Sequence, residues 1–100
     1  MKVTVQSVNF NADQKLINFV EQKLNKLENR FDKIIYADVF LKLENTNEPE
    51  NKITEILISV PGNELVVKKT NKKFEEGVDE GVNTLLRQLQ KRKEKIRAYA

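Results

Sequence analysis

Residues 53–70 read ITEILISVPGNELVVKKT, and this stretch decides the fold because it predicts two adjacent antiparallel strands. Its first half alternates in polarity, so three apolar residues point to one face of a strand: Ile56, Ile58 and Val60. The triplet PGN at 61–63 is typical of a tight turn. Residues 64–70 then form the second strand of a hairpin.

A third strand is predicted over residues 34–44, which read IIYADVFLKLE. Its two faces differ in polarity, with Val39, Leu41 and Leu43 on one face and Asp38, Phe40, Lys42 and Glu44 on the other. The polar residues 45–52, which include Pro49, predict a loop between this strand and the hairpin.

A fourth strand is expected at the start of the chain, where residues 2–10 read KVTVQSVNF. The alternation of its valines shifts phase by one residue before Val8, which indicates a β-bulge. Asn11 follows as an expected helix N-cap, because Gln14 three residues later completes a capping-box pattern.

Two helices are predicted, over residues 12–30 and 71–98. The apolar stripe of the first is Leu16, Val20, Leu24, Leu27 and Phe31, and that of the second is Phe74, Val78, Val82, Leu85, Leu89 and Ile96. Gly77 and Gly81 flank the second stripe, where they indicate either close approach of another backbone or a weak point in the helix. The acidic residues in its first turns suit the helix dipole better than a metal site.

The resulting order is β-α-β-β-β-α. Short connections make the last three strands antiparallel, and the helical crossover permits a parallel pair of first and second strands. Because both helices must bury their stripes, the predicted fold class is α+β, a two-layer sandwich of a four-stranded sheet with two helices packed on one face. We expect residues 1–100 to form a single domain.

Several function classes are disfavoured by composition. Hydrophobic residues make up 39% of the 100 residues and charged residues 33%, and no apolar run approaches the length of a membrane span. The start of the chain does not resemble a signal peptide, so we expect a cytoplasmic protein. Without cysteine or histidine, the chain lacks the usual nucleophile–base pairs and metal ligands. We therefore expect no catalytic residues, no metal, no cofactor, no small-molecule substrate and no membrane partner.

Charge is unevenly distributed in this chain of net charge +3. Residues 87–97 hold six cations and one glutamate, a net charge of +5, so the rest of the chain carries −2. A second cationic group lies on one side of the first helix, at Lys15, Lys23, Lys26, Arg30 and Lys33, and a third comprises Lys68, Lys69, Lys72 and Lys73. If the two helices lie side by side, the first two groups flank one groove that can neutralise nucleic-acid phosphates. A solvated helix end is the plainer alternative.

Three segments resemble a known family. KLENRFDKI (26–34), the strand YADVFLKLE after it, and DEGVNTLLRQLQKRKEKI (79–96) are similar to the bacterial ribosome hibernation-promoting factors. This family is also called the ribosome-associated translation inhibitor or sigma-54 modulation protein family. The basic positions that match it are Lys23, Lys26, Lys33, Arg87, Lys91, Lys93 and Lys95. With Arg30 and Arg92, which the charge pattern adds, these are the predicted rRNA-binding residues.

The resemblance implies a stress-response or stationary-phase factor of the short form, without a second dimerising domain. Such a factor binds 16S rRNA of the 30S subunit in the channel for messenger and transfer RNA, inhibits translation, and in some members promotes inactive ribosome dimers. Two alternatives remain from the sequence. One is a general double-stranded RNA-binding domain, because residues 12–98 run α-β-β-β-α. The other is a protein-interaction regulator of transcription.

Overall fold

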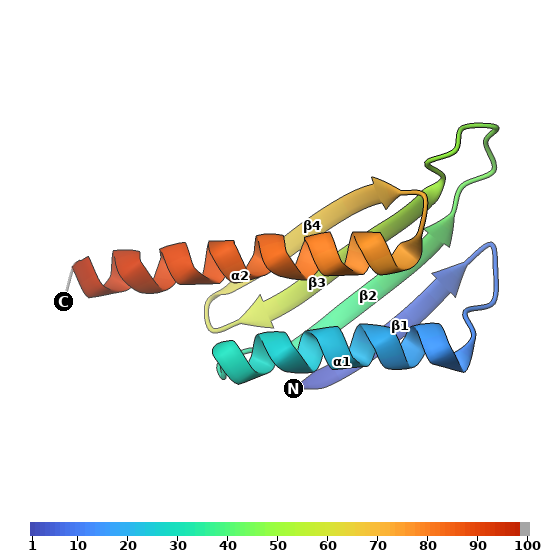
Figure 1. Cartoon of the computed structure of the whole chain (residues 1–100). Coiled ribbons are helices and arrows are strands. Elements are labelled where there is room, and N and C mark those ends of the chain that lie inside the picture. Colours follow the sequence, from blue (N-terminus) through green and yellow to red (C-terminus); the bar gives the residue numbers. More distant parts are fainter. Residues whose placement is uncertain (99–100) are drawn as a thin grey trace.

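The computed structural model describes residues 1–98, with side chains up to Arg92 (Figure 1). In chain order its elements are β1 (Lys2–Val8), α1 (Gln14–Arg30), β2 (Tyr36–Leu43), β3 (Lys52–Val60), β4 (Asn63–Asn71) and α2 (Phe74–Ala98). The predicted order β-α-β-β-β-α is therefore confirmed. Residues 71–73 were expected in the second helix, but Asn71 pairs with Lys52 as the last residue of β4, so α2 begins at Phe74.

The four strands lie in the order β1-β2-β3-β4. β1 and β2 are parallel, whereas β2 and β3, and β3 and β4, are antiparallel. The parallel pair follows from α1, which returns the chain to the end of the sheet where β1 began. Pro61 and Gly62 form the turn between β3 and β4, and Gly62 has a φ of 78° that suits glycine because it has no Cβ.

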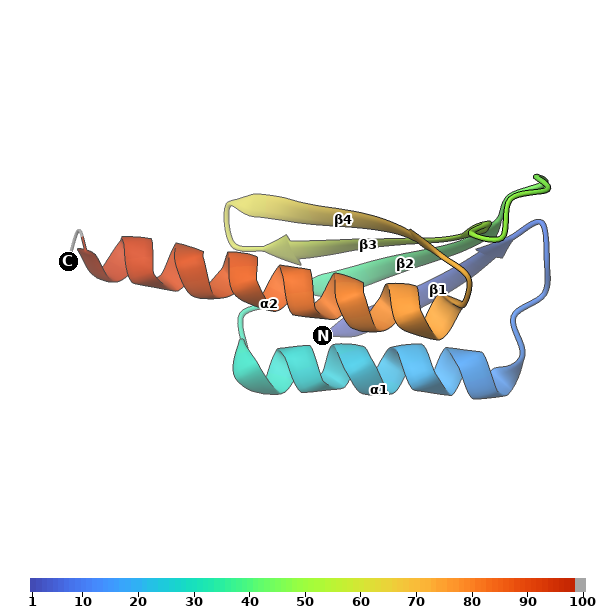
Figure 2. The same cartoon turned by 45° about the horizontal axis from the view of Figure 1, so that its top comes forward.

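Both helices lie side by side on one face of the sheet, and the other face of the sheet carries no helix (Figure 2). The predicted two-layer sandwich is confirmed. Over the described residues, neither helix is long and apolar enough to cross a membrane.

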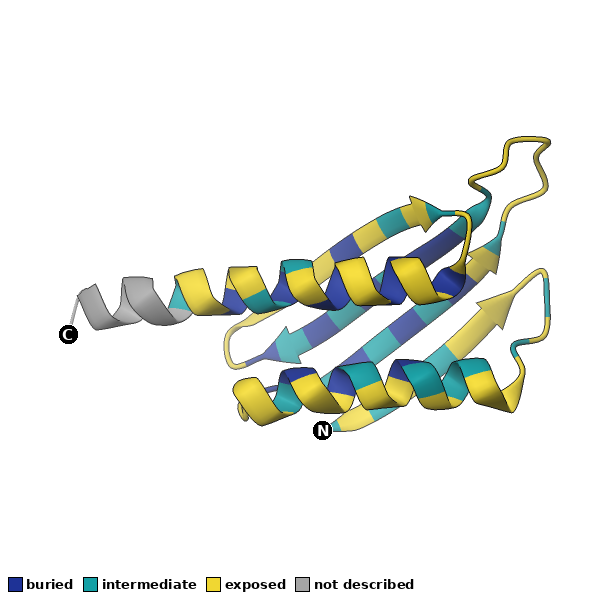
Figure 3. Cartoon of the chain, viewed as in Figure 1, coloured by how far each residue is buried: buried dark blue, intermediate teal, exposed yellow. Residues whose placement is uncertain are grey.

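The core lies between these two layers, where buried residues of the strands alternate with more exposed ones (Figure 3). Its members follow the predicted faces: Val39, Leu41, Ile56, Ile58 and Val60 from the sheet, Val20, Leu24 and Leu27 from α1, and Phe74, Val78, Val82, Leu85 and Leu89 from α2. Each such side chain contributes about 1.5–3 kcal/mol relative to an exposed position. Ile96 lies outside the described side chains.

The connection from β1 to α1 differs from the prediction at two points. β1 pairs with β2 without interruption up to Val8, so the predicted bulge is wrong, and the change of phase occurs at Asn9, which has a φ of 68°. The predicted N-cap at Asn11 is also wrong. The Asp13 side chain accepts a hydrogen bond from the backbone N–H of Leu16 at 2.8 Å and caps the helix.

A tertiary contact of Phe10 explains why α1 begins later than predicted. The Phe10 ring stacks on that of Phe74, with 4.7 Å between centroids and 9° between planes. This contact draws the connection towards α2 before α1 begins. Phe10 and Ala12 are both packed against the core.

Alanine substitutions at Asn11 and Asp13 distinguish the predicted N-cap from the observed one. We expect Asp13→Ala to lower the free energy of unfolding by about 1 kcal/mol, because the N–H of Leu16 loses its acceptor. Asn11→Ala should change it by less than about 0.5 kcal/mol, as expected for a surface position away from such a feature. Urea denaturation followed by circular dichroism measures both, and equal losses would contradict the assignment of Asp13 as the cap.

Gly77 and Gly81 lie on the face of α2 that touches the sheet, and both are buried. A Cβ on Gly77 would lie 2.5 Å from Thr54 Oγ1, and a Cβ on Gly81 would lie 2.9 Å from Ile56 Cδ1. The predicted close approach of another backbone is wrong: the close neighbours are side chains of β3 and β4, namely Thr54, Asn71, Ile56 and Val67. The glycines therefore let α2 settle closely on the sheet.

Candidate nucleic-acid interface

A groove runs between the two helices, and α1 supplies its cations. Burial of Val20, Leu24 and Leu27 fixes the rotation of α1, and this rotation places the cationic side of the helix next to α2. The α1–α2 groove has a volume of about 190 Å³ and is lined by Lys23, Lys26, Leu27, Arg30, Asp79, Val82, Asn83 and Leu86. It continues past Arg30 into a second hollow of about 260 Å³, whose other lining residues are Phe31, Leu86, Leu89 and Gln90.

The contribution of α2 to this groove differs from the expectation. Within the described side chains, α2 lines it with Asp79, Asn83, Leu86 and Gln90, at helical spacing, and with no cation. The expected convergence of cations from both helices is thus not seen over residues 1–92, where α1 alone lines the groove with cations. Asn83 and Gln90 were not predicted as groove residues. The sequence does show the signal, because positions 79, 83, 86 and 90 follow one another at steps of three or four and so share one side of a helix.

Lys23 makes two contacts within the protein. Its Nζ lies 3.0 Å from Asp79 Oδ1 across the groove, and 5.5 Å from the centroid of the Phe19 ring. The Lys23 side chain is 27% exposed and that of Asp79 is 52% exposed, so water screens the ion pair. Asp79 therefore competes with any phosphate for this ammonium group.

Removal of the Asp79 charge should strengthen anion binding. We expect Asp79→Asn to raise the affinity for 30S subunits about 3- to 10-fold, because Lys23 is released and a negative charge leaves the groove. Titration of labelled protein with 30S subunits measures this effect. Glu76→Gln is the matched control, since it removes the same charge from the same helix outside the groove; an equal gain there would contradict the specific role of Asp79.

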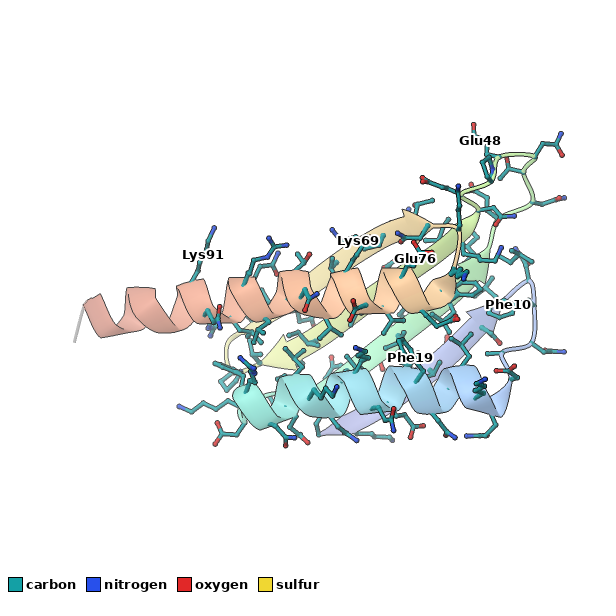
Figure 4. All side chains as sticks on the ribbon, viewed as in Figure 1. Phe10, Phe19, Glu48, Lys69, Glu76 and Lys91 are labelled. Carbon is teal, nitrogen blue, oxygen red and sulfur yellow. The ribbon has the colours of Figure 1, made fainter. Side chains whose placement is uncertain are left out.

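Other predicted rRNA-binding residues are more scattered. Lys33 is exposed in the connection after α1, and Arg87 is exposed with its Nη2 3.4 Å from Thr84 Oγ1. Lys91 projects from the side of α2 that faces away from α1 (Figure 4). Lys93 and Lys95 lie outside the described side chains.

Arg92 serves a structural contact. Its Nη2 donates a hydrogen bond of 2.6 Å to the carbonyl oxygen of Pro61 in the β3–β4 turn, and the residue is half-buried. The guanidinium thus ties α2 to the hairpin, which leaves less of it free for an external phosphate.

The third cationic group is divided by the structure. Lys68 lies on the helix-free face of the sheet with Phe40 and Lys42, whereas Lys69 is half-buried on the opposite face, because neighbouring residues of a strand alternate. Lys72 and Lys73 are exposed between β4 and α2. These four lysines do not form one patch.

Among the side chains of residues 1–92, no group of three acidic residues is placed to hold a metal ion. The α1–α2 groove instead offers cations above an apolar floor of Leu27 and Val82, an arrangement suited to phosphate neutralisation.

Comparison with known proteins finds relatives that match nearly the whole chain. Residues 3–97 match the family described as Sigma 54 modulation protein / S30EA ribosomal protein. A ribosome hibernation promoting factor of Pseudomonas putida is 30% identical over 95 residues, which cover 95% of this chain and 89% of that protein. A ribosome hibernation promotion factor of Bacillus subtilis is 30% identical over 98 residues, which cover 96% of this chain and 50% of that protein.

Two solved structures share the fold. A ribosomal subunit interface protein from Coxiella burnetii superposes with a TM-score of 0.82 at 20% identity, covering 94% of this chain and 99% of its own. The N-terminal domain of Thermus thermophilus Protein Y gives a TM-score of 0.76 at 23% identity, covering 91% of this chain and 98% of its own. The named relatives are ribosome-associated hibernation factors rather than enzymes. From the match across residues 3–97 and these relatives, the chain belongs to the Sigma 54 modulation protein / S30EA ribosomal protein family.

Proposed function

We propose that this protein is a ribosome hibernation factor that binds 16S rRNA of the small subunit in the channel for messenger and transfer RNA and inhibits translation. The observation that carries the proposal is the α1–α2 groove, where Lys23, Lys26 and Arg30 line one side. Family membership supports the ribosome as the partner. The same proposal implies a cytoplasmic protein.

The inhibition requires no catalysis. Lys26 and Arg30 are exposed and neutralise rRNA phosphates, which releases counterions and makes binding depend on salt. The body of the protein, with extents of 50 × 24 × 19 Å, then excludes messenger and transfer RNA by its volume. Phosphate neutralisation thus provides the affinity, and the volume of the bound protein excludes messenger and transfer RNA.

Cosedimentation with purified ribosomal subunits tests this function. We expect the protein in 30S and 70S fractions at modest salt, and its release as salt is raised. Its absence from both fractions at modest salt would overturn the proposal. Equal binding to a plain RNA duplex would instead favour a general double-stranded RNA-binding domain.

Ribosome pairing is measured in the same sucrose gradients. Because the relatives are named as factors that promote ribosome hibernation, we infer that addition of the protein to 70S ribosomes increases a peak heavier than 70S. An unchanged profile, with the protein bound to 70S, would remove dimer promotion from the proposal and leave rRNA binding intact.

A further inference from the structure

A second concave site lies at the other end of the helix pair, where α1 and α2 begin. This aromatic pocket has a volume of about 380 Å³ and is lined by Phe10, Asn11, Asp13, Lys15, Leu16, Phe19 and Glu75. Phe10 comes from the β1–α1 connection and Phe19 from α1 (Figure 4). Neither the predicted rRNA-binding set nor the α1–α2 groove contains any of these residues.

The aromatic walls of the pocket are held in place by their neighbours. Phe10 stacks on Phe74, which is only 6% exposed and belongs to the core, so the Phe10 ring is anchored. Phe19 is half-buried, and the Lys23 ammonium lies 5.5 Å from its ring centroid. Rings fixed in this way lose little conformational entropy when a planar ligand stacks on them.

Charge argues against a phosphate in the pocket. Two carboxylates, of Asp13 and Glu75, face one ammonium, of Lys15, so the lining carries a net negative charge. Asp13 Oδ1 already accepts from the N–H of Leu16, whereas the Glu75 carboxylate has no hydrogen-bond or ion-pair partner among the described side chains. The lining therefore suits a neutral planar group that presents N–H donors to Glu75.

One lysine lies between the aromatic pocket and the cationic groove. Lys23 contacts the Phe19 ring and lines the α1–α2 groove, and Lys26 follows one turn further along α1. A nucleotide whose base enters the aromatic pocket can therefore direct its phosphate towards these lysines. This arrangement separates an aromatic site of net negative charge, for the base, from a cationic site for the backbone.

We propose that the aromatic pocket binds a single unpaired guanine base of RNA. Stacking on phenylalanine rings accepts any base, but the N1–H and N2–H groups of guanine offer two adjacent donors to the carboxylate of Glu75. The inference rests on the proposed rRNA-binding function and adds to it a base-specific contact outside the groove.

The first test compares two phenylalanine variants in the whole protein. Phe19→Leu keeps the apolar volume but removes the ring, so we expect about 10-fold weaker binding to 30S subunits with an unchanged salt slope, since the number of neutralised phosphates stays the same. Phe40→Leu, on the helix-free face of the sheet, is the matched control and should bind as the unmodified protein does. Equal affinities of the two variants would overturn the inference.

The second test identifies the base. Guanosine 5′-monophosphate should shift the amide NMR resonances of residues 10–19 and 75 more than the adenosine, cytidine and uridine monophosphates do, and Glu75→Gln should abolish this preference. Equal shifts with all four nucleotides would overturn the guanine assignment. So would larger shifts with N-acetyltyrosine amide, which represents an aromatic side chain of a protein partner. No shift from a protein that still cosediments with 30S subunits would reject the pocket alone, whereas loss of cosedimentation would reject the proposed function.

Discussion

Replacement of both Lys26 and Arg30 by glutamate should weaken binding to 30S subunits by about 100-fold near 0.1 M salt. Both side chains are exposed, line the α1–α2 groove and have no acidic partner among residues 1–92, so they are available to phosphates. Each reversal abolishes the neutralisation of a phosphate and adds a repelling charge. The slope of log affinity against log salt should therefore fall by about 0.7–0.9 for each phosphate that is no longer neutralised. Titrations at several salt concentrations measure both quantities.

The control for this double variant carries the same change of net charge elsewhere. Lys2→Glu with Lys42→Glu alters two exposed lysines, and in the sheet register both point to the helix-free face. We expect this control to bind 30S subunits within a few-fold of the unmodified protein, as any weakening there reflects only long-range electrostatics. Equal weakening in the two double variants would show that binding depends on net charge and not on the groove.

Gly77→Ala should lower the free energy of unfolding by about 2 kcal/mol, although alanine is the better helix former. The new Cβ would overlap Thr54 Oγ1 at 2.5 Å and approach Thr54 Cβ at 3.0 Å. Because Thr54 is only 1% exposed, its side chain cannot move aside freely. Overpacking of this kind costs about 1–3 kcal/mol and outweighs a propensity gain of about 1 kcal/mol. Urea denaturation followed by circular dichroism gives the value.

Gly81→Ala provides the comparison within the same helix. Its nearest neighbour is Ile56 Cδ1 at 2.9 Å, the terminal methyl of a longer side chain, and the next is Val67 Cγ1 at 3.4 Å. Because this overlap is smaller than that at Gly77, we expect a change of less than about 1 kcal/mol. Adding Thr54→Ala to Gly77→Ala should recover part of the stability, because the hydroxyl that causes the closest overlap is removed. Equal stability of the two single glycine variants would contradict this account of how α2 packs on β3.

Local patterns were sufficient to predict most of the fold. In β2 and β3 the side that faces the core is set by a period of two, so Val39 and Ile56 could be assigned to the core without a tertiary contact. The start of α1 could not be assigned in this way, since Asn11 and Asp13 are both suitable caps. The choice depends on the stacking of Phe10 on Phe74, which are 64 positions apart.

In the candidate site, too, local patterns predict some features and contacts between distant residues decide the others. The sequence places Lys23, Lys26 and Arg30 on one side of α1, but only the packing of the helices reveals that Asp79 lies across from Lys23. The bond from Arg92 to Pro61 joins residues 31 positions apart, and no periodicity indicates it. The sequence therefore identifies a cationic helix side, whereas contacts distant in sequence determine which cations remain available.

The central claim is that the helix side of this protein faces 16S rRNA, and a tethered cleavage reagent tests it most directly. The chain has no cysteine, so Asn83→Cys in the groove and Thr70→Cys on the helix-free face can each carry one iron–EDTA group. With 30S subunits bound, we predict strong cleavage of 16S rRNA along the channel for messenger and transfer RNA from position 83 and weaker cleavage from position 70. Cleavage that is strong only from position 70, or that falls outside the channel, would contradict the account.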